Sequence, residues 1–188
     1  MKQIIMIFLV LSLQSCFHPT EIQKDFGCTD KISINDAIMM QDFQKKFELM
    51  VPKKWATKLF YNEYQTSLMT ADSLQPLTKS FILDVSLNNG ELKVDENIKN
   101  TVIRNIISKE HLRIKKFKVG KFQNKPSVWL LAEGTRNNMP FHLFKVLSKK
   151  DATTYYQIEA QIYGDSLVNK RVCKVISMLE TLKEVPKK

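Results

Sequence analysis

The sequence predicts an α+β fold, in which an antiparallel sheet of about six to seven strands carries amphipathic helices on its faces. Short segments of alternating apolar and polar residues follow one another along most of the 188-residue chain, each bounded by turn residues. Two longer segments instead repeat apolar residues at helical spacing. The length and an apolar fraction of 44% suit one globular domain with a sizeable core.

The start of the chain has the features of a secretory signal peptide. Lys2 supplies a positive charge, residues 4–13 form a nearly continuous apolar run, and the small residue Ser15 precedes Cys16. The run is shorter than the roughly 20 apolar residues that a membrane-spanning helix needs. Residues 1–15 are therefore interpreted as a signal peptide.

The end of this leader resembles the lipobox of bacterial lipoproteins, in which cleavage precedes a cysteine that then receives lipid. Leu13, Ser15 and Cys16 match the pattern, whereas Gln14 is a less usual residue at its position. The resemblance implies a lipid on Cys16 and a place in the bacterial cell envelope, in the outer membrane and facing the periplasm. The alternative is an ordinary signal peptide followed by an incidental cysteine.

Residues 16–30 show no sustained periodicity, and they contain Pro19 and Gly27. They are predicted to form a flexible tether that reaches on the order of 20 Å between the lipid and the domain. The domain itself is expected to span residues 31–188. Residues 31–45 are ambiguous between a short helix and an irregular lead-in.

Cys28 and Cys173 remain as an even pair once Cys16 is set aside for lipid. An exported protein folds in an oxidising compartment, which favours a disulfide between them. This bridge would tie the start of the domain to its last helix. Two free, buried thiols are the alternative, because an unpaired cysteine behaves as a small apolar residue.

Alternation predicts the strands, and turn residues separate them. In the first strand, Phe47, Leu49 and Val51 lie on one face, and Pro52 ends the segment. The predicted strands are 47–51, 66–70 and 80–87, followed after a helix by a meander of 111–119, 127–134, 140–148 and 153–163. Alternation slips at Lys115-Lys116, which predicts a β-bulge there.

Two amphipathic helices complete the prediction. Asp95 has the position of an N-cap for a helix over 96–109, whose apolar stripe is expected to pack on the sheet. Asp165 is expected to cap a closing helix of about 18 residues.

This element order, with Phe47, Pro52 and Trp55 in the first strand and its turn, resembles the PsbP-like fold over residues 46–184. Plant photosystem extrinsic subunits, a Ran-binding nuclear-transport protein and several bacterial envelope lipoproteins share that fold. The resemblance implies an antiparallel sheet with helices packed on its faces. It also implies a binding or assembly role without catalysis.

Basic residues exceed acidic ones in the chain. With the leader removed, 28 Lys and Arg stand against 19 Asp and Glu, a net charge of +9. Behind an export signal, this excess indicates phospholipid head groups, anionic glycans or an acidic protein as partners, and not nucleic acid. A solvated, lysine-rich surface is the simplest alternative.

One hairpin concentrates this charge and is a candidate partner-binding site. Phenylalanines alternate with its basic residues, and residues 111–125 contain no acid. The candidate residues are Arg113, Lys115, Lys116, Lys118, Lys121 and Lys125. The alternative is structural, because lysines on an edge strand prevent pairing with other chains.

The sequence contains no established catalytic or cofactor motif. His18, His111 and His142 do not have metal-ligand spacing, and the glycines do not cluster into a phosphate-binding loop, so neither a metal nor a cofactor is predicted. Asp84 lies within an apolar strand and is expected to point outward, with a buried catalytic acid as the alternative.

The leading hypothesis is therefore a lipid-anchored, non-catalytic envelope protein that binds or organises another envelope component. A second is a small hydrolase or transferase, which requires Asp84 or Glu159 close to His111 or His142. A third is a carrier of an apolar ligand, which requires a large cavity between helix and sheet. The sequence leaves the oligomeric state open.

Overall fold

A computed structural model of the whole chain describes residues 19–28, 34 and 36–186. The predicted signal peptide 1–15 and the predicted lipid site Cys16 lie outside these residues. Among the described residues, none of the helices is both long enough and apolar enough to span a bilayer.

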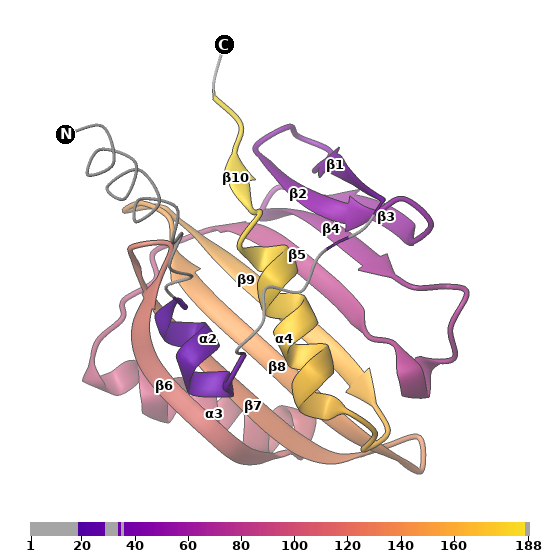
Figure 1. Cartoon of the computed structure of the whole chain (residues 1–188). Coiled ribbons are helices and arrows are strands. Elements are labelled where there is room, and N and C mark those ends of the chain that lie inside the picture. The colour runs from indigo at the N-terminus through magenta and orange to yellow at the C-terminus, as the bar shows by residue number, and fades with distance from the viewer. Residues whose placement is uncertain (1–18, 29–33, 35, 187–188) are drawn as a thin grey trace, which may run out of the picture.

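A seven-stranded antiparallel sheet forms the body of the domain (Figure 1). Its strand order is β3-β4-β5-β9-β8-β7-β6. The strands are β3 (Ala56–Tyr61), β4 (Gln65–Ala71), β5 (Ile82–Asn89), β6 (Arg113–Phe122), β7 (Lys125–Arg136), β8 (Met139–Lys149) and β9 (Thr154–Tyr163). The predicted meander is β6 to β9, and the predicted α+β class is confirmed.

A smaller antiparallel sheet lies beside one end of the large sheet, in the order β1-β2-β10. Its strands are β1 (Ala37–Gln41), β2 (Phe47–Pro52) and β10 (Lys183–Glu184). In β2, Phe47, Leu49 and Val51 are buried and the residues between them are half-buried, so the predicted alternation is confirmed. The ambiguous stretch 31–45 contains β1, which pairs with β2.

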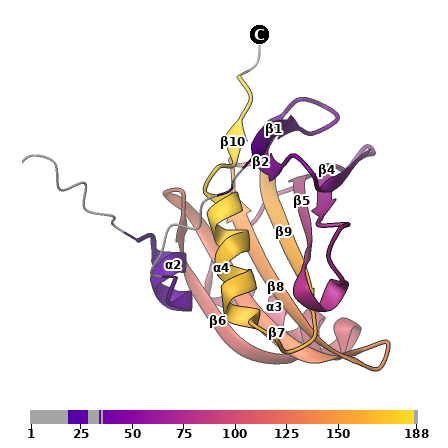
Figure 2. The same cartoon turned by 45° about the vertical axis from the view of Figure 1, so that its right-hand side comes forward.

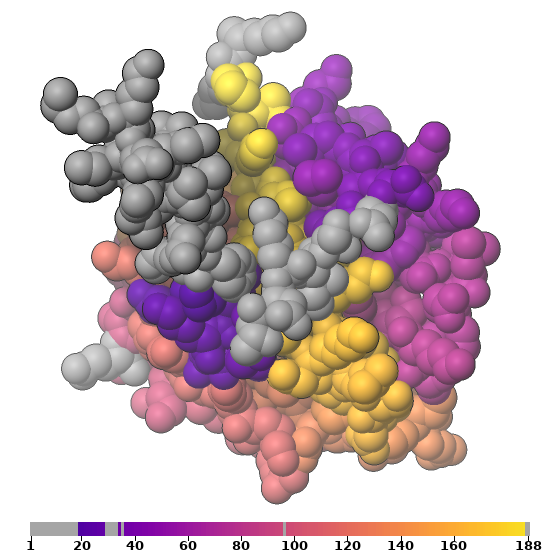
Figure 3. Space-filling model, viewed as in Figure 1, coloured from indigo at the N-terminus to yellow at the C-terminus, as the bar shows by residue number. Residues whose placement is uncertain are grey.

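One face of the large sheet is covered by α2 (Glu21–Phe26), α4 (Val168–Leu179) and the small sheet, which enclose the main core (Figures 1 and 2). The space-filling view shows α2 and α4 sharing this face (Figure 3). The inward residues of β9 are Tyr156, Ile158, Ala160 and Ile162, as predicted.

The other face carries α3 (Glu96–Glu110), whose buried residues Val102 and Ile106 pack on β7 and β8 in a second core. The side chain of Asp95 accepts hydrogen bonds from the backbone N–H groups of Asn97 and Ile98, so the predicted N-cap is confirmed. Helix α3 covers only the β6–β8 side of this face.

The prediction of a flexible tether over residues 16–30 is wrong for its described part. Residues 21–26 form α2, and Ile22 and Phe26 are buried in the main core. Thr20 and Gln23 form a reciprocal capping box at the start of this helix. The short helix is stabilised by packing, because six residues are too few for a helix to be stable alone.

The predicted disulfide is confirmed. Cys28 and Cys173 are bridged, with Cα atoms 5.4 Å apart. The bond joins Cys28, two residues after the end of α2, to the middle of α4, and both cysteines are buried. It therefore fixes the two helices side by side on the same face of the sheet.

Two local predictions differ from the structure, and a third is confirmed. The predicted cap Asp165 does not cap α4: the helix begins after Leu167, and the Asp165 carboxylate instead contacts His142 at 2.8 Å. The strand predicted over 111–119 is displaced, because β6 runs from Arg113 to Phe122 and includes Gly120. The bulge predicted at Lys115-Lys116 is confirmed, since the register shifts between Ile114 and Lys116.

Candidate binding surfaces

The groups required by the hydrolase hypothesis do not converge. Asp84 and Glu159 lie opposite each other on β5 and β9, on the face that carries α3. His142 pairs with Ile162, whose side chain lies in the main core. The imidazole therefore projects from the main-core face of the sheet, opposite to the face that carries the two acids. His111 is exposed at the C-terminal end of α3. Neither histidine shares a pocket with the two acids.

Asp84 and Glu159 are nevertheless unlike ordinary surface acids. Burial raises the pKa of Asp84, an effect opposed by the hydrogen bond that Ser86 donates to it at 3.0 Å and reinforced by the negative charge of Glu159. Glu159 accepts a hydrogen bond from the Lys145 ammonium at 2.6 Å. Asp84 is expected to point outward, away from the main core, and its position on the face that α3 covers only in part agrees with this. Among the described residues, no three acids, cysteines or histidines form a metal-binding group.

The carrier hypothesis requires a large cavity between helix and sheet, and α3 covers a small one. This cavity has a volume of about 220 Å³, below the range of about 300–1,000 Å³ that is usual for ligand pockets. Lys145, Tyr155 and Gln157 line it together with Leu92 and Leu147. A cavity of this size and mixed lining does not suit an apolar cargo.

The structure divides the predicted basic hairpin into paired and free cations. Arg113 and Lys115 both contact Glu133, and Lys116 lies 3.5 Å from the Asp25 carboxylate on α2. The Arg113 guanidinium holds the pKa of Glu133 below its usual value, and Lys115 adds to this effect.

The remaining cations, Lys118, Lys121 and Lys125, form no ion pair within the described part of the chain. Because β6 is an edge strand, its lysines have the arrangement that prevents pairing with another sheet. Partner binding by this hairpin stays a prediction.

The opposite edge of the large sheet, at β3, is poor in charged residues and rich in exposed apolar and aromatic ones. Strand β3 pairs only with β4, so within the described residues its other side presents unpaired backbone groups. Lys58 is the only charged residue of this strand. Around it lies a group of exposed large apolar and aromatic residues, here called the aromatic edge: Phe43, Leu59, Phe60, Tyr61 and Tyr64.

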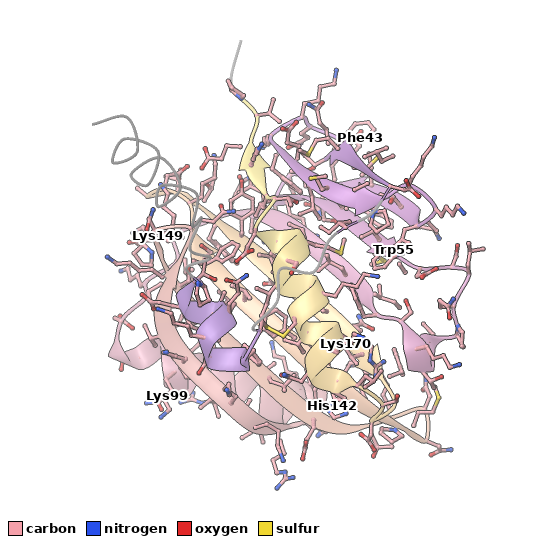
Figure 4. All side chains as sticks on the ribbon, in the orientation of Figure 1. Phe43, Trp55, Lys99, His142, Lys149 and Lys170 are labelled. Atoms are coloured by element: carbon pink, nitrogen blue, oxygen red, sulfur yellow. A yellow bond between two sulfur atoms is a disulfide. The ribbon has the colours of Figure 1, made fainter. Side chains whose placement is uncertain are left out.

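The aromatic edge is held in place by the structure beneath it. Phe43, in the β1–β2 turn, stacks on Tyr61 with ring centroids 4.2 Å apart (Figure 4 shows Phe43 at this end of the domain). Buried Asp42 fixes that turn, because its carboxylate accepts hydrogen bonds from the backbone N–H of Phe47 and from the Thr66 hydroxyl, both at 2.7 Å. The exposed rings therefore project from a rigid support.

Sequence reasoning missed this surface. All of residues 56–61 except the half-buried Thr57 are exposed, so they lack the alternation that predicts a half-buried strand. The available signal was the density of aromatic residues between Phe60 and Tyr64, next to a turn that contains Asn62.

No protein-family model matches the chain, and no curated protein sequence matches it. Solved structures do. The cyanobacterial PsbP protein CyanoP from Synechocystis sp. PCC 6803 superposes with a TM-score of 0.51 at 7% identity, covering 79% of this chain and 92% of that one. The Ran-binding protein Mog1p of Saccharomyces cerevisiae superposes with a TM-score of 0.54 at 10% identity, covering 79% and 95%. The chain therefore has a PsbP- and Mog1-like fold.

Proposed function

We propose that this protein is a lipid-anchored, non-catalytic component of the bacterial cell envelope that binds a protein partner through its aromatic edge. The exposed rings of Phe43, Phe60, Tyr61 and Tyr64 at an unpaired strand carry the proposal. The separation of His111 and His142 from the Asp84–Glu159 pair supports a role without catalysis. The name of Mog1p, a Ran-binding protein with the same fold, is in line with a protein partner.

The lipid anchor is proposed from Leu13, Ser15 and Cys16. The capping box at Thr20 marks where the folded domain begins, and it therefore limits the distance between the domain and an anchor on Cys16. Only residues 17–19 separate Cys16 from Thr20, so an extended lead spans at most about 14 Å. A lipid on Cys16 would therefore hold the domain close to the bilayer, with α2 nearest to it.

The binding mode proposed for the aromatic edge is strand addition. An extended segment of the partner pairs with the free side of β3, and its side chains contact the aromatic residues. Backbone hydrogen bonds supply the alignment, while aromatic rings are the residues that most often dominate the energy of interfaces. The position of Lys58 on this strand favours a partner segment with an acidic residue.

The test is capture of envelope partners by the protein in its native membrane, using crosslinking and mass spectrometry. Phe60→Lys places a charge on the free strand and is expected to abolish the crosslinked partner while the domain stays folded. Ile107→Lys on α3 is the matched control, because Ile107 is 53% exposed and Phe60 is 46% exposed. Equal loss in both variants, or retention in Phe60→Lys, would contradict the proposal.

The basic hairpin is tested in the same experiment as a separate contact. Joint replacement of Arg113, Lys115, Lys116 and Lys118 by glutamine should weaken capture only where the hairpin touches the partner. Unchanged capture would limit these residues to the structural role on the edge strand.

Anchoring is tested independently of the partner. Cys16→Ser should release the protein from membranes into the soluble fraction, and labelling with palmitate should be lost. Continued membrane retention of the variant would contradict a lipid anchor at Cys16.

A further inference from the structure

A cationic pocket lies at the N-terminal end of α4, on the face of the sheet away from α3. It has a volume of about 310 Å³, and its lining residues are Lys79, Ser166, Leu167, Lys170, Arg171 and Lys174. Four of these six side chains are basic and none is acidic. Figure 4 shows Lys170 on this helix.

The pocket combines two segments that are far apart in the sequence. Lys79 closes the short 3₁₀ helix η2 (Leu77–Lys79), about 90 residues before the α4 residues. Arg171 joins the two segments: its guanidinium donates hydrogen bonds to the carbonyl oxygen of Ser80 at 3.0 Å and to those of Tyr163, Gly164 and Ser166 at 2.8, 2.7 and 2.6 Å. The site is therefore built by the fold.

Arg171 also supplies a buried charge. The residue is only 6% exposed, and all of its hydrogen-bond partners are neutral carbonyl groups. Its Nε atom is buried without a partner in the described structure. The Asp165 carboxylate attracts this charge but forms no ion pair with it in the described structure, so the buried cation still lowers the cost of placing an anion nearby, where attraction is weakly screened.

The other charges of the pocket are also unneutralised. Lys79, Lys170 and Lys174 form no ion pair within the part of the chain that the structure describes. Lys174 holds its ammonium 4.9 Å from the centre of the Trp55 ring. The nearby carboxylate of Asp165 is occupied by His142, at 2.8 Å.

The first turn of α4 adds hydrogen-bond donors to this charge. Leu167 precedes the helix without a side-chain cap, so the backbone N–H groups of the first turn have no partner from that residue. Such N–H groups together with the helix dipole favour an anion, and here they adjoin the lysines. Leu167 is 67% exposed and gives the pocket an apolar wall.

From this combination we infer that the pocket binds a phosphate group carried on a small organic molecule or a lipid head group. Its concave shape and its size suit a small ligand better than a protein surface. Three lysine ammonium groups match the charge and the several oxygens of a phosphate better than a single carboxylate. The inference does not depend on the aromatic edge or on the lipid anchor.

The test is a ligand titration of the Cys16→Ser protein, a variant that removes any contribution of an anchor. Binding is monitored through the amide NMR chemical shifts of residues 168–170. The probes are inorganic phosphate, glycerol 3-phosphate, vesicles of phosphatidylglycerol and acetate. Saturable shifts with glycerol 3-phosphate would assign a soluble phosphate ester. Saturation with phosphatidylglycerol vesicles alone would assign a lipid head group. Acetate is expected to bind at least about tenfold more weakly than the phosphate probes.

Two variants complete the experiment. Joint Lys79→Gln, Lys170→Gln and Lys174→Gln should weaken phosphate binding by at least about tenfold without unfolding the domain. Joint Lys99→Gln, Lys109→Gln and Lys183→Gln removes the same charge elsewhere and should preserve binding. Absent binding of every phosphate probe, acetate binding as tightly as phosphate, or equal affinities of the two variants would overturn the inference.

Discussion

Trp129 on β7 donates its indole N–H to the carboxylate of Asp25 on α2, at a distance of 2.8 Å and across 104 residues of sequence. The indole is fully buried, so this hydrogen bond satisfies a donor that water cannot reach. Lys116 on β6 binds the same residue, through its backbone carbonyl and its carboxylate. Asp25 therefore holds α2 against β6 and β7, at one side of the large sheet.

Removal of this carboxylate is predicted to destabilise the whole domain. Asp25→Ala should lower the free energy of unfolding by about 1–3 kcal/mol, because it leaves the Trp129 N–H buried without an acceptor. Urea unfolding of Asp25→Ala, Trp129→Phe and the double variant measures the coupling between the two residues. Glu63→Ala, at an exposed acid, is the control and should have little effect. Additive single effects would show that the bond contributes little.

Gly120 is predicted to tolerate no side chain. A Cβ atom there would clash with the Trp129 ring and lie 2.5 Å from a Glu21 carboxylate oxygen, so the buried ring would have to move and the Glu21 side chain would have to turn away. Gly120→Ala should therefore cost about 1–3 kcal/mol of stability, measured by urea unfolding. Gly27→Ala is the comparison, since open space surrounds that position and only its positive φ opposes a side chain. A Gly120→Ala domain as stable as the parent would contradict this packing.

Reduction of the Cys28–Cys173 disulfide is predicted to lower the melting temperature. The bridged residues are 145 positions apart, and the chain-entropy model gives an upper value of about 5 kcal/mol for so long a loop. Thermal unfolding with and without a reductant measures the effect. The double variant Cys28→Ser, Cys173→Ser should melt at the reduced temperature and be insensitive to the reductant. Equal melting of oxidised and reduced protein would show that α2 is held by packing alone.

Two aspartates are predicted to respond to pH with opposite signs. The pKa of Asp84 is raised by burial, so the folded state binds more protons than the unfolded state above the ordinary pKa, and stability falls as pH rises through that window. Asp84→Asn should therefore stabilise the domain at neutral pH and lose this benefit in acid.

The control for this prediction is Asp151, in the turn between β8 and β9. Hydrogen bonds from the backbone N–H of Thr153 and the hydroxyl of Thr154 lower the pKa of Asp151, so its stabilising effect is present at neutral pH and is lost as pH falls. Asp151→Asn should accordingly destabilise at about pH 7 and somewhat less at about pH 3, because the effect fades only as pH falls from the ordinary aspartate pKa toward the lowered one. Melting temperatures of Asp84→Asn and Asp151→Asn at the two pH values test these opposite pKa shifts. Changes of the same sign in the two variants at about pH 7 would contradict them.

The meander was predictable because its strands have one buried face, and Tyr156, Ile158 and Ile162 show this as a period of two. Helix α2 was missed because tertiary packing stabilises six residues that have no helical repeat of their own, although Thr20 and Gln23 already had the spacing of a capping box. Asp165 was misjudged because a carboxylate before a helix can bind a side chain from elsewhere, here His142.

The binding surfaces depend on tertiary arrangement, which the sequence pattern does not contain. The basic hairpin is contiguous in sequence, yet Glu133 and Asp25 neutralise half of its cations after folding. The cationic pocket shows the reverse case, because its cations are far apart in the sequence. Lys79 and Lys170 line the same pocket after folding, and Arg171 joins their two segments by its hydrogen bond to Ser80. The number of basic residues in a continuous stretch of sequence therefore did not predict where the folded surface carries unpaired positive charge.

The two edges of the large sheet differ in a way that limits assembly. Lysines line β6, whereas β3 has unpaired backbone groups and exposed aromatic rings. The lysines of β6 disfavour strand pairing at that edge, so strand addition is expected at β3 and not head to tail through both edges of the sheet. Under the proposed strand addition, each molecule would therefore accept one added strand, at β3.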